Sequence, residues 1–421
     1  MTSQPSNLRW LMISLVFLGT AINYLDRQTL SVVAPELIDQ FHMSNIAYSR
    51  VIFAFMLAYT VMNAISGPLI DRLGTRAGYA LTATWWSIAA MLHALAYGPW
   101  TLGLYRFLLG MGEAGNWPAG VKVVAEWFPV RERALASGIF NSGSAFGAIV
   151  APPVIVWIVL NTGWREAFFL VGAVGLVWVL LWSLVYHTPP EAEREERSAT
   201  VPARELFRTR FVWSFTLAKI FLDPVWYFYI FWFPEYLKRA RHFDLASIGM
   251  YAWIPFLVAG LGNLLGGWLA GVLLRRNIPL TVARKSAVTL FALLMLAAIP
   301  AVLTTSASRS IGLVSVAMLG YTGVTANMLA FPADVFPKRV LATIWGLAGT
   351  GSGFGGMVFS LITGWLVDRY SYVPVFIGFG LLPIVALSVI WFVLGPLHPI
   401  LMLGDQASTG YATAGIRQTQ H

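Results

Sequence analysis

The sequence of 421 residues contains no cysteine. A chain without thiols forms no disulfide bond and no thiolate metal site, so both are excluded. The redox state of its compartment therefore cannot be inferred from cysteine usage. Charged residues are also scarce. They make up 11% of this chain, whereas soluble proteins carry roughly 25%. Hydrophobic residues make up 57% of the sequence, which is more than one soluble core can bury.

Several patterns of catalysis and cofactor binding are missing as well. No glycine-rich loop carries the lysine that holds a nucleotide phosphate, which argues against an ATP-driven pump. No Ser-His-Asp arrangement and no cluster at metal-ligand spacing stands out. The sequence therefore predicts neither an enzyme nor a bound cofactor or metal.

Apolar residues form long runs along the whole chain. Each run has about 20 residues, enough for a helix that crosses a hydrocarbon core of roughly 30 Å. Lipid offers no partner for backbone polar groups, so the runs are expected to be helices of an all-α membrane protein. We count twelve, with approximate bounds 9–33, 47–70, 78–96, 100–121, 134–158, 166–187, 211–236, 248–273, 283–304, 309–329, 342–366 and 373–395.

Lysine and arginine are distributed unevenly between the loops. If the N-terminus is cytoplasmic, the loops and span ends on that side carry 18 of the 28 basic residues, and those on the opposite side carry seven. Because cytoplasmic loops are enriched in basic residues, both termini are predicted to be cytoplasmic. These loops account for the net charge of +9, and no basic stripe predicts a nucleic-acid partner.

The longest polar stretch divides the chain in the middle. Residues 188–210 carry mixed charge and are interpreted as a cytoplasmic linker with no further function. The predicted domains are an N-terminal six-helix half, residues 1–187, and a C-terminal six-helix half, residues 211–396. The polar residues 397–421 predict a disordered cytoplasmic tail.

The two halves share a repeated segment. Phe128-Pro129-Val130-Arg131 recurs as Phe336-Pro337-Lys338-Arg339, and the small residues that follow recur with it as far as Gly147 and Gly355. The register has no gap and a constant offset of 208 residues. Parallel repeats of this kind place a substrate site near the membrane midplane, between the halves.

Charged residues lie inside two runs of the first half, Asp26 and Arg27 in the first run and Arg106 and Glu113 in the fourth. Charge at membrane depth is costly and usually marks a substrate or proton pathway, which indicates a transporter. Arg106 and Glu113 are two helical turns apart, so both are expected on one face of one helix, which Asn116 continues. Burial favours the neutral acid and a neighbouring arginine favours the carboxylate. Substrate capture of the arginine would therefore switch Glu113 toward protonation.

A second polar cluster lies in the seventh run. Lys219 and Asp223 are one turn apart, and Pro224 beside them removes a backbone hydrogen bond. Trp226 and Tyr227 follow and offer an apolar ring surface and a hydroxyl. A sugar ring presents C–H faces to aromatic rings and hydroxyls to polar side chains, so the cluster suits a polyhydroxy acid. The alternative is an internal salt bridge beside a lipid-interface aromatic belt.

The loop after the second run, residues 67–76, resembles the loop signature of the major facilitator superfamily. The resemblance implies the fold of that superfamily, with two pseudo-symmetric halves. Asp71, Arg72 and Arg76 are assigned to gating, as a charge cluster that latches the halves. The second-half counterpart, residues 267–276, lacks the acidic residue, so any latch is asymmetric.

Further motifs resemble one branch of that superfamily, the anion:cation symporters, which carry organic acids. They are Asn23-Tyr24-Leu25-Asp26-Arg27, the segment from Tyr105 to Pro118, and Glu126-Trp127-Phe128-Pro129. The seventh run, from Asp223 to Pro234, is most similar to that of the hexuronate transporters. The resemblance covers the membrane portion and leaves out the C-terminal tail.

The resemblance assigns roles by motif position. In that branch the first-span aspartate and the fourth-span glutamate carry the coupling proton, which implies Asp26 and Glu113. The arginine after the aspartate contacts the substrate anion, which implies Arg27. The alternative is that Asp26 with Arg27, and Arg106 with Glu113, are only buried ion pairs. We expect the substrate-binding set to comprise Tyr24, Arg27, Arg106, Asn116, Asn141, Ser144, Lys219, Asp223, Trp226, Tyr227 and Asn327.

The function that the resemblance implies is proton-coupled import of a hexuronate, galacturonate or glucuronate, by alternating access. The partners would be the organic anion, a proton and the lipid of a bacterial inner membrane, with the protein as a monomer. Glucarate, galactonate, tartrate and lactate remain open, although Ser144 stands where some aldonate carriers have glutamine, which disfavours an aldonate. A second class is a non-transporting sensor on the same fold, but the linker is short and nothing resembles a docking module.

Overall fold

The computed structural model describes residues 8–128, 132–188, 209–336 and 341–398, without the side chains of residues 133–135 and 341–343. Within these ranges every regular element is a helix. Most of the predicted linker and tail, and part of the repeated Phe-Pro segment, lie outside the described residues.

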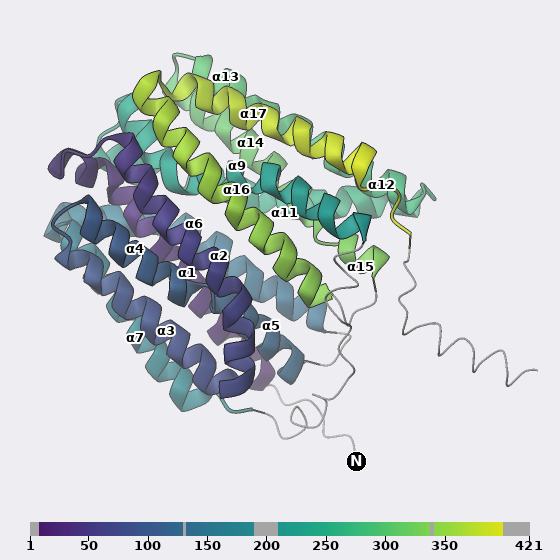
Figure 1. Cartoon of the computed structure of the whole chain (residues 1–421), viewed down its shortest axis with the longest axis horizontal. Helices are drawn as coiled ribbons and strands as arrows, with labels where there is room; N and C mark the ends of the chain where they lie inside the picture. The colour runs from purple at the N-terminus through teal and green to yellow at the C-terminus, as the bar shows by residue number, and fades with distance from the viewer. Residues whose placement is uncertain (1–7, 129–131, 189–208, 337–340, 399–421) are drawn as a thin grey trace, which may run out of the picture.

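The helices before the linker pack mainly on one another, and Figure 1 shows them as one purple-to-blue group. Within this first group α1 packs on α6, α2 on α4, and α3 on α7. The group comprises α1 (Leu8–Gln40), α2 (Asn45–Leu73), α3 (Thr75–Leu92) with η1 (His93–Leu95), α4 (Pro99–Glu113), α5 (Asn116–Trp127), α6 (Arg133–Thr162) and α7 (Trp164–Val185).

The helices after the linker form a second group beside the first, coloured teal to yellow in Figure 1. Here α9 packs on α16 and α17, and α14 packs on α11 and α12. The group comprises α9 (Arg210–Arg241), α10 (Leu245–Tyr251), α11 (Ile254–Arg275), α12 (Leu280–Leu294), η3 (Met295–Ala297), α13 (Ala298–Leu303), α14 (Ala307–Met328), α15 (Phe331–Val335), α16 (Leu341–Arg369), α17 (Tyr372–Ser388) and the π-helical η5 (Val389–Val393).

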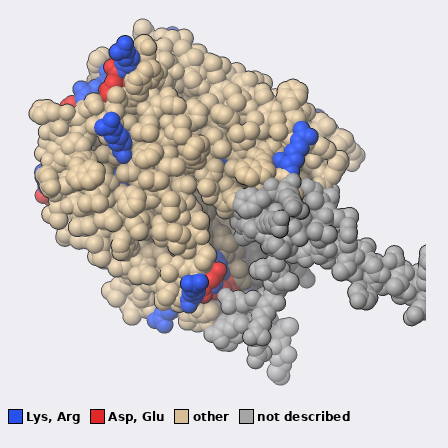
Figure 2. Space-filling model, viewed as in Figure 1, with Lys and Arg blue, Asp and Glu red and all other residues tan. Residues whose placement is uncertain are grey.

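Nine helical segments in the described part of the chain are long and apolar enough to cross a membrane. The other three predicted spans, 78–96, 100–121 and 211–236, coincide with α3, with α4 and α5 together, and with α9. Figure 2 shows a largely uncharged face, with the few basic and acidic side chains near its two ends. A surface of this kind suits an environment of lipid.

The fourth predicted span is two helices and not one. The first, α4, ends at Glu113, and α5 begins at Asn116. Pro118 has no N–H to donate to the carbonyl one turn before it, which interrupts the ladder of hydrogen bonds. The turn also lies close to α3, because a Cβ at Gly115 would be 2.6 Å from the Thr82 side chain. The prediction of one continuous helix from Arg106 to Asn116 is therefore wrong.

The two groups are joined by polar contacts at one end of the molecule, which we call the closed end. The Asp368 carboxylate accepts from the backbone N–H groups of Asn45 and Ile46, at 2.9 and 2.8 Å, and so caps the start of α2. Asp39 of α1 pairs with Lys238 and Arg239 of α9. Two further hydrogen bonds between the groups, from Ser31 to the Ile230 carbonyl and from Tyr48 to the Phe231 carbonyl, lie inward of that end.

The seam between α2 and α16 extends inward from the closed end. Glycines of α16 lie directly against α2, since a Cβ at Gly364 would be 2.6 Å from the carbonyl oxygen of Asn45, and one at Gly353 would clash with Thr60. Side chains larger than hydrogen would hold the two helices apart. At the opposite end, where α1 begins, Figure 2 shows a recess between the two groups.

Candidate functional site

Arg27 of α1 and Glu113 of α4 form an ion pair inside the first group. Their side chains are 3% and 0% exposed. The Nε and Nη2 atoms of Arg27 donate hydrogen bonds of 2.9 and 2.8 Å to Oε2 of Glu113. Two charge-assisted bonds to one oxygen fix both the position and the orientation of the guanidinium. The other carboxylate oxygen, Oε1, has no hydrogen-bond partner among the described residues.

Three aromatic rings surround the Arg27 guanidinium. Its Cζ atom lies 4.9 Å from the ring centre of Tyr24, 5.2 Å from that of Phe55 and 4.8 Å from that of Tyr59. Cation–π contacts of this kind hold a guanidinium without neutralising it. Phe55 and Tyr59 were not predicted, because an aromatic residue in an uncharged helix resembles any apolar residue. Their one-turn spacing on α2 was the available signal.

Arg106 and Asp26 complete the charged groups of the first cluster. Arg106 donates from Nη2 to the backbone carbonyl of Arg27 at 2.7 Å, and its Nη1 atom has no partner among the described residues. Both carboxylate oxygens of Asp26 are buried, and the described part of the chain offers them no hydrogen bond. The alternative pairing of Asp26 with Arg27 and of Arg106 with Glu113 is therefore wrong, since Arg27 takes Glu113 instead.

The second cluster lies on α9 and α14. Lys219 and Asp223 form a buried ion pair of 2.8 Å, one turn apart on α9. The Tyr321 hydroxyl donates a hydrogen bond of 3.1 Å to Asp223, so two donors share that carboxylate. The Trp226 ring stacks on the Tyr321 ring, with centres 5.3 Å apart and an angle of 11° between their planes. The ion pair, which is the alternative stated above for Lys219 and Asp223, thus lies beside a flat aromatic surface formed by Trp226 and Tyr321. Helix α9 continues through Pro224 without a break.

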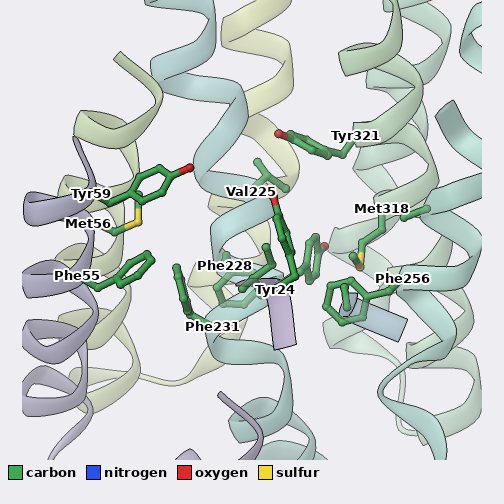
Figure 3. Close-up of a cluster of buried hydrophobic side chains, with 14 of the residues drawn as sticks. Tyr24, Phe55, Met56, Tyr59, Val225, Phe228, Phe231, Phe256, Met318 and Tyr321 are labelled. Carbon is green, nitrogen blue, oxygen red and sulfur yellow. The ribbon is translucent and has the colours of Figure 1, made fainter. Parts of the chain in front are cut away.

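The first cluster and the second cluster face each other between the two helix groups. In Figure 3, Tyr59 of α2 and Tyr321 of α14 point their hydroxyls toward each other. The Tyr227 hydroxyl lies 3.2 Å from that of Ser352 on α16. Tyr227 is close enough to Tyr59 and Arg27 to interact with them electrostatically. The polar atoms of both groups therefore converge on one region between the groups.

Three other predicted contact residues, Asn116, Asn327 and Ser144, form hydrogen bonds within the helix packing. Asn116 accepts from the Tyr79 hydroxyl at 2.6 Å and donates to the Thr20 hydroxyl at 3.2 Å. Asn327 donates to carbonyls of α11 and α14, at 2.9 and 3.0 Å. The Ser144 hydroxyl donates to the backbone carbonyl of Asn141, whose side chain is half-buried on α6.

The residues predicted to latch the halves make contacts within the first group in this conformation. The Asp71 carboxylate accepts from Lys122 of α5 at 2.8 Å. Arg76 donates to the backbone carbonyl of Ser183 on α7. Arg72 is exposed. In this conformation the ion pairs that join described residues of the two groups are those of the closed end.

The charges of the two clusters balance. Three carboxylates and three cations are buried here, so the fully ionised site carries no net charge. One added proton alone, or one added anion alone, would unbalance this charge. The six residues are Asp26, Glu113, Asp223, Arg27, Arg106 and Lys219. The described residues include no group of His, Asp and Glu that could hold a metal ion.

A family model described as Major Facilitator Superfamily matches residues 16–358 of this chain. The hexuronate transporter of Escherichia coli strain K12 is 35% identical over 407 residues, covering 92% of this chain and 94% of that protein. The galacturonate transporter of Dickeya chrysanthemi is 38% identical over 308 residues, covering 69% and 89%. Among solved structures, a D-xylose-proton symporter matches with a TM-score of 0.72 at 17% identity, covering 92% of this chain and 98% of that one.

Proposed function

The chain belongs to the Major Facilitator Superfamily, and from that premise we propose that it is a proton-coupled symporter that imports a hexuronate, galacturonate or glucuronate, by alternating access. Membership makes it a multi-pass membrane transporter and not an enzyme. Its relatives are bacterial, so its membrane is the inner membrane. Relatives named for hexuronate and galacturonate support the choice of substrate.

The proposed topology has twelve spans with both termini in the cytoplasm. Three of these spans are α3, α4 together with α5, and α9. They are shorter or carry more polar residues than the other nine. Residues 1–187 and 211–396 are the two halves, joined by the linker 188–210. The basic residues of the loops support this orientation. The closed end is then the outer face, and the structure is an inward-facing state.

The pairing of Arg27 with Glu113 carries the proposal. A buried arginine held by two hydrogen bonds to a carboxylate is a site where a substrate carboxylate competes with a proton-binding group. When the substrate takes Arg27, Glu113 loses its partner, and a buried carboxylate without a partner is costly until it binds a proton. Substrate binding and proton binding thereby favour each other.

Asp26 is the second proposed proton site. Its carboxylate is buried and lacks a partner among the described residues, and it lies next to Arg27 in sequence on α1. A buried charge of this kind persists only where neighbouring charges compensate it, and Arg106 is the cation with an unused nitrogen. We propose that Asp26 and Glu113 exchange protons with the cytoplasm in this inward-facing state.

The balanced charge of the site sets the expected substrate class. A monoanion together with one proton leaves the site neutral, whereas a dianion needs two protons for the same result. A monocarboxylate such as a hexuronate therefore matches one protonation event. An aldarate such as glucarate is the alternative that needs both Asp26 and Glu113 protonated.

The second cluster is proposed to hold the sugar ring. The stacked rings of Trp226 and Tyr321 offer a flat apolar surface, and Lys219 and Tyr227 offer donors for hydroxyls. A ring-form uronate uses both features, whereas lactate uses neither. Galactonate and tartrate share the hydroxyls but lack the ring, so they rank below a uronate.

A monomer in the lipid bilayer suffices for this mechanism, because the two halves of one chain supply both clusters. The second candidate, a sensor on the same fold, would bind the same acids without moving them. Uptake of labelled galacturonate into proteoliposomes under an imposed pH gradient, inside alkaline, tests the proposal. Accumulation above the external concentration is the expected result. Binding without any uptake would favour the sensor.

A thermal-shift screen of sugar acids tests the substrate. Ligands that bind the folded state raise the melting temperature according to their affinity. The expected order is uronate first, then aldonate and aldarate, then lactate. A larger shift with glucarate than with galacturonate would contradict the hexuronate assignment.

A further inference from the structure

A buried carboxylate lies at the closed end, away from both clusters of the site. Glu235 of α9 has no exposed surface. Its Oε1 atom accepts a hydrogen bond of 2.9 Å from Nε of Arg239, and its Oε2 atom has no partner among the described residues. Arg239 also pairs with Asp39 of α1, in the other half. Glu235 thus holds the arginine that joins the two halves.

The charged and titratable groups around Glu235 come from four helices. Lys238 and Arg239 are on its own helix, and Lys238 pairs with Asp39 at 2.5 Å. Asp39 itself lies close enough to interact electrostatically with Glu235. Tyr48 of α2 and Tyr372 of α17 lie in the same range, and the Tyr372 hydroxyl is buried with no partner among the described residues.

Solvent reaches this network through a cavity. A cavity of about 520 Å³, partly open to the surface, is lined by Arg239, Tyr236, Tyr372 and Asn45 among others. Asn45 belongs to the seam, where Asp368 caps α2. Solvent at the closed end therefore contacts Arg239, and Glu235 lies one hydrogen bond behind it.

We propose that Glu235 is a proton-accepting residue of the outer gate, which as a carboxylate holds Arg239 against Asp39 and on protonation releases Arg239 so that the outer end opens. The proton enters from solvent and binds Oε2. The charge-assisted bond from Arg239 to Oε1 then becomes a weaker bond to a neutral acid, while Arg239 keeps its own charge. The inference rests on the proposed function, because it takes the closed end as the outer face.

Protonation of Glu235 would give protons a second role in import, besides their binding at the central site. Acid outside would favour the outward-open state before substrate binds, and the protons of the central site would be taken up afterwards. A purely structural pair would instead hold Arg239 equally well at every pH. The two roles differ in a measurable way.

The absence of cysteine makes gate opening directly measurable. Ser49 of α2 is fully buried against Gly364 in the seam, so Ser49→Cys adds a thiol that a bulky maleimide reaches only when the outer end opens. Ser308, at the start of α14 and exposed, provides Ser308→Cys as the reference for the reagent's own pH dependence. The measured quantity is the labelling rate of Ser49→Cys relative to Ser308→Cys, without substrate, in purified protein.

In the otherwise unchanged chain we expect the relative rate to rise from neutral to mildly acidic pH. Glu235→Gln should raise the rate at neutral pH by roughly tenfold, the factor that corresponds to losing one charge-assisted hydrogen bond, and should abolish the rise with acid. Glu166→Gln makes the same chemical change at an exposed residue of α7 on the same side and should behave like the unchanged chain.

A third background separates this inference from the proposed function. In Asp26→Asn/Glu113→Gln the central proton sites are removed, and the acid response should persist if Glu235 supplies it. A response that vanishes there but survives in Glu235→Gln would overturn the inference. An open gate in Glu235→Gln combined with no acid response in the unchanged chain would also overturn it, leaving Glu235 as a structural support for Arg239. Neither result depends on whether galacturonate is transported.

Discussion

Arg27 and Glu113 lie on different helices, 86 residues apart, yet two hydrogen bonds of 2.9 and 2.8 Å join them in a site that excludes solvent. A group that attracts an anion is thereby tied to a group that binds a proton. Any ligand that binds one of them changes the state of the other, which is the minimum requirement for coupled transport.

The first prediction concerns Glu113. Glu113→Gln keeps the shape and an oxygen acceptor for Arg27 but removes the exchangeable proton. Counterflow of labelled hexuronate should continue, because exchange requires no net proton movement, whereas accumulation driven by a pH gradient should vanish. Both assays are run in the same proteoliposome preparation. Loss of both activities would mean that Glu113 builds the site, and retention of both would remove it from the mechanism.

The second prediction concerns Asp26, whose oxygens have no partner among the described residues. If the coupling proton passes between Asp26 and Glu113, Asp26→Asn should also abolish gradient-driven accumulation and leave counterflow in place. Removing an unpaired buried charge should not lower stability, so the melting temperature should stay level or rise. Partial gradient-driven uptake by this variant would point to Glu113 as the sole coupling site.

The third prediction separates the charge of Arg27 from its geometry. Arg27→Lys keeps one positive charge but loses the two-pronged contact, so affinity for a uronate should fall by roughly 10- to 100-fold, as expected for the loss of a charged hydrogen bond. Arg27→Ala should abolish binding and leave Glu113 unpaired, which costs about 3–5 kcal/mol of stability. Binding by calorimetry and melting by circular dichroism provide the two readouts.

Adding Glu113→Gln to Arg27→Ala should restore much of the lost stability, since the unpaired charge is gone, but should not restore binding. Undiminished affinity in purified Arg27→Ala would show that the substrate carboxylate binds elsewhere.

The fourth prediction concerns Lys219. Lys219→Ala should weaken uronate binding by roughly tenfold or more through loss of a charged donor. Asp223 keeps the Tyr321 hydrogen bond, so the fold should survive. Asp223→Asn is the matched control, because it breaks the same ion pair while leaving the lysine free for substrate. Uptake at the level of the unchanged chain in Lys219→Ala would make the pair a purely structural one.

The long apolar helices were predictable from the sequence because membrane burial imposes a simple pattern, and α1, α2, α6 and α7 fall close to the expected spans. The break after Glu113 was not predicted, although Pro118 was visible, because proline alone does not determine whether a membrane helix kinks or ends. The sequence identified the charged residues as functional candidates, but it did not determine which residues they pair with.

In the first cluster, the spacing of charged residues in the sequence predicted the wrong ion-pair partners. Arg106 and Glu113 are two helical turns apart, a spacing that allows an ion pair within one helix. In the structure Glu113 instead pairs with Arg27 from another helix. Tyr59 offered only its one-turn spacing from Phe55 in an apolar helix, and Glu235 offered no signal beyond being a carboxylate near a span's end. Both became visible only when packing brought distant helices together, which local periodicity does not encode.

The glycines that hold α2 against α16 also decide where the electric field of the membrane acts. Gly353 and Gly364 are three helical turns apart, so the dry seam is about 16 Å thick along the helix axis. In the proposed inward-facing state, water in the recess on the other side would make most of the voltage drop across the seam. One uncompensated charge carried past it would require about 2.3 kcal/mol per 100 mV. With three carboxylates and three cations at the centre, neither the empty site nor a site loaded with a monoanion and one proton carries such a charge. Under the proposed proton coupling, the chemical proton gradient would thus drive transport, and the membrane voltage would contribute little.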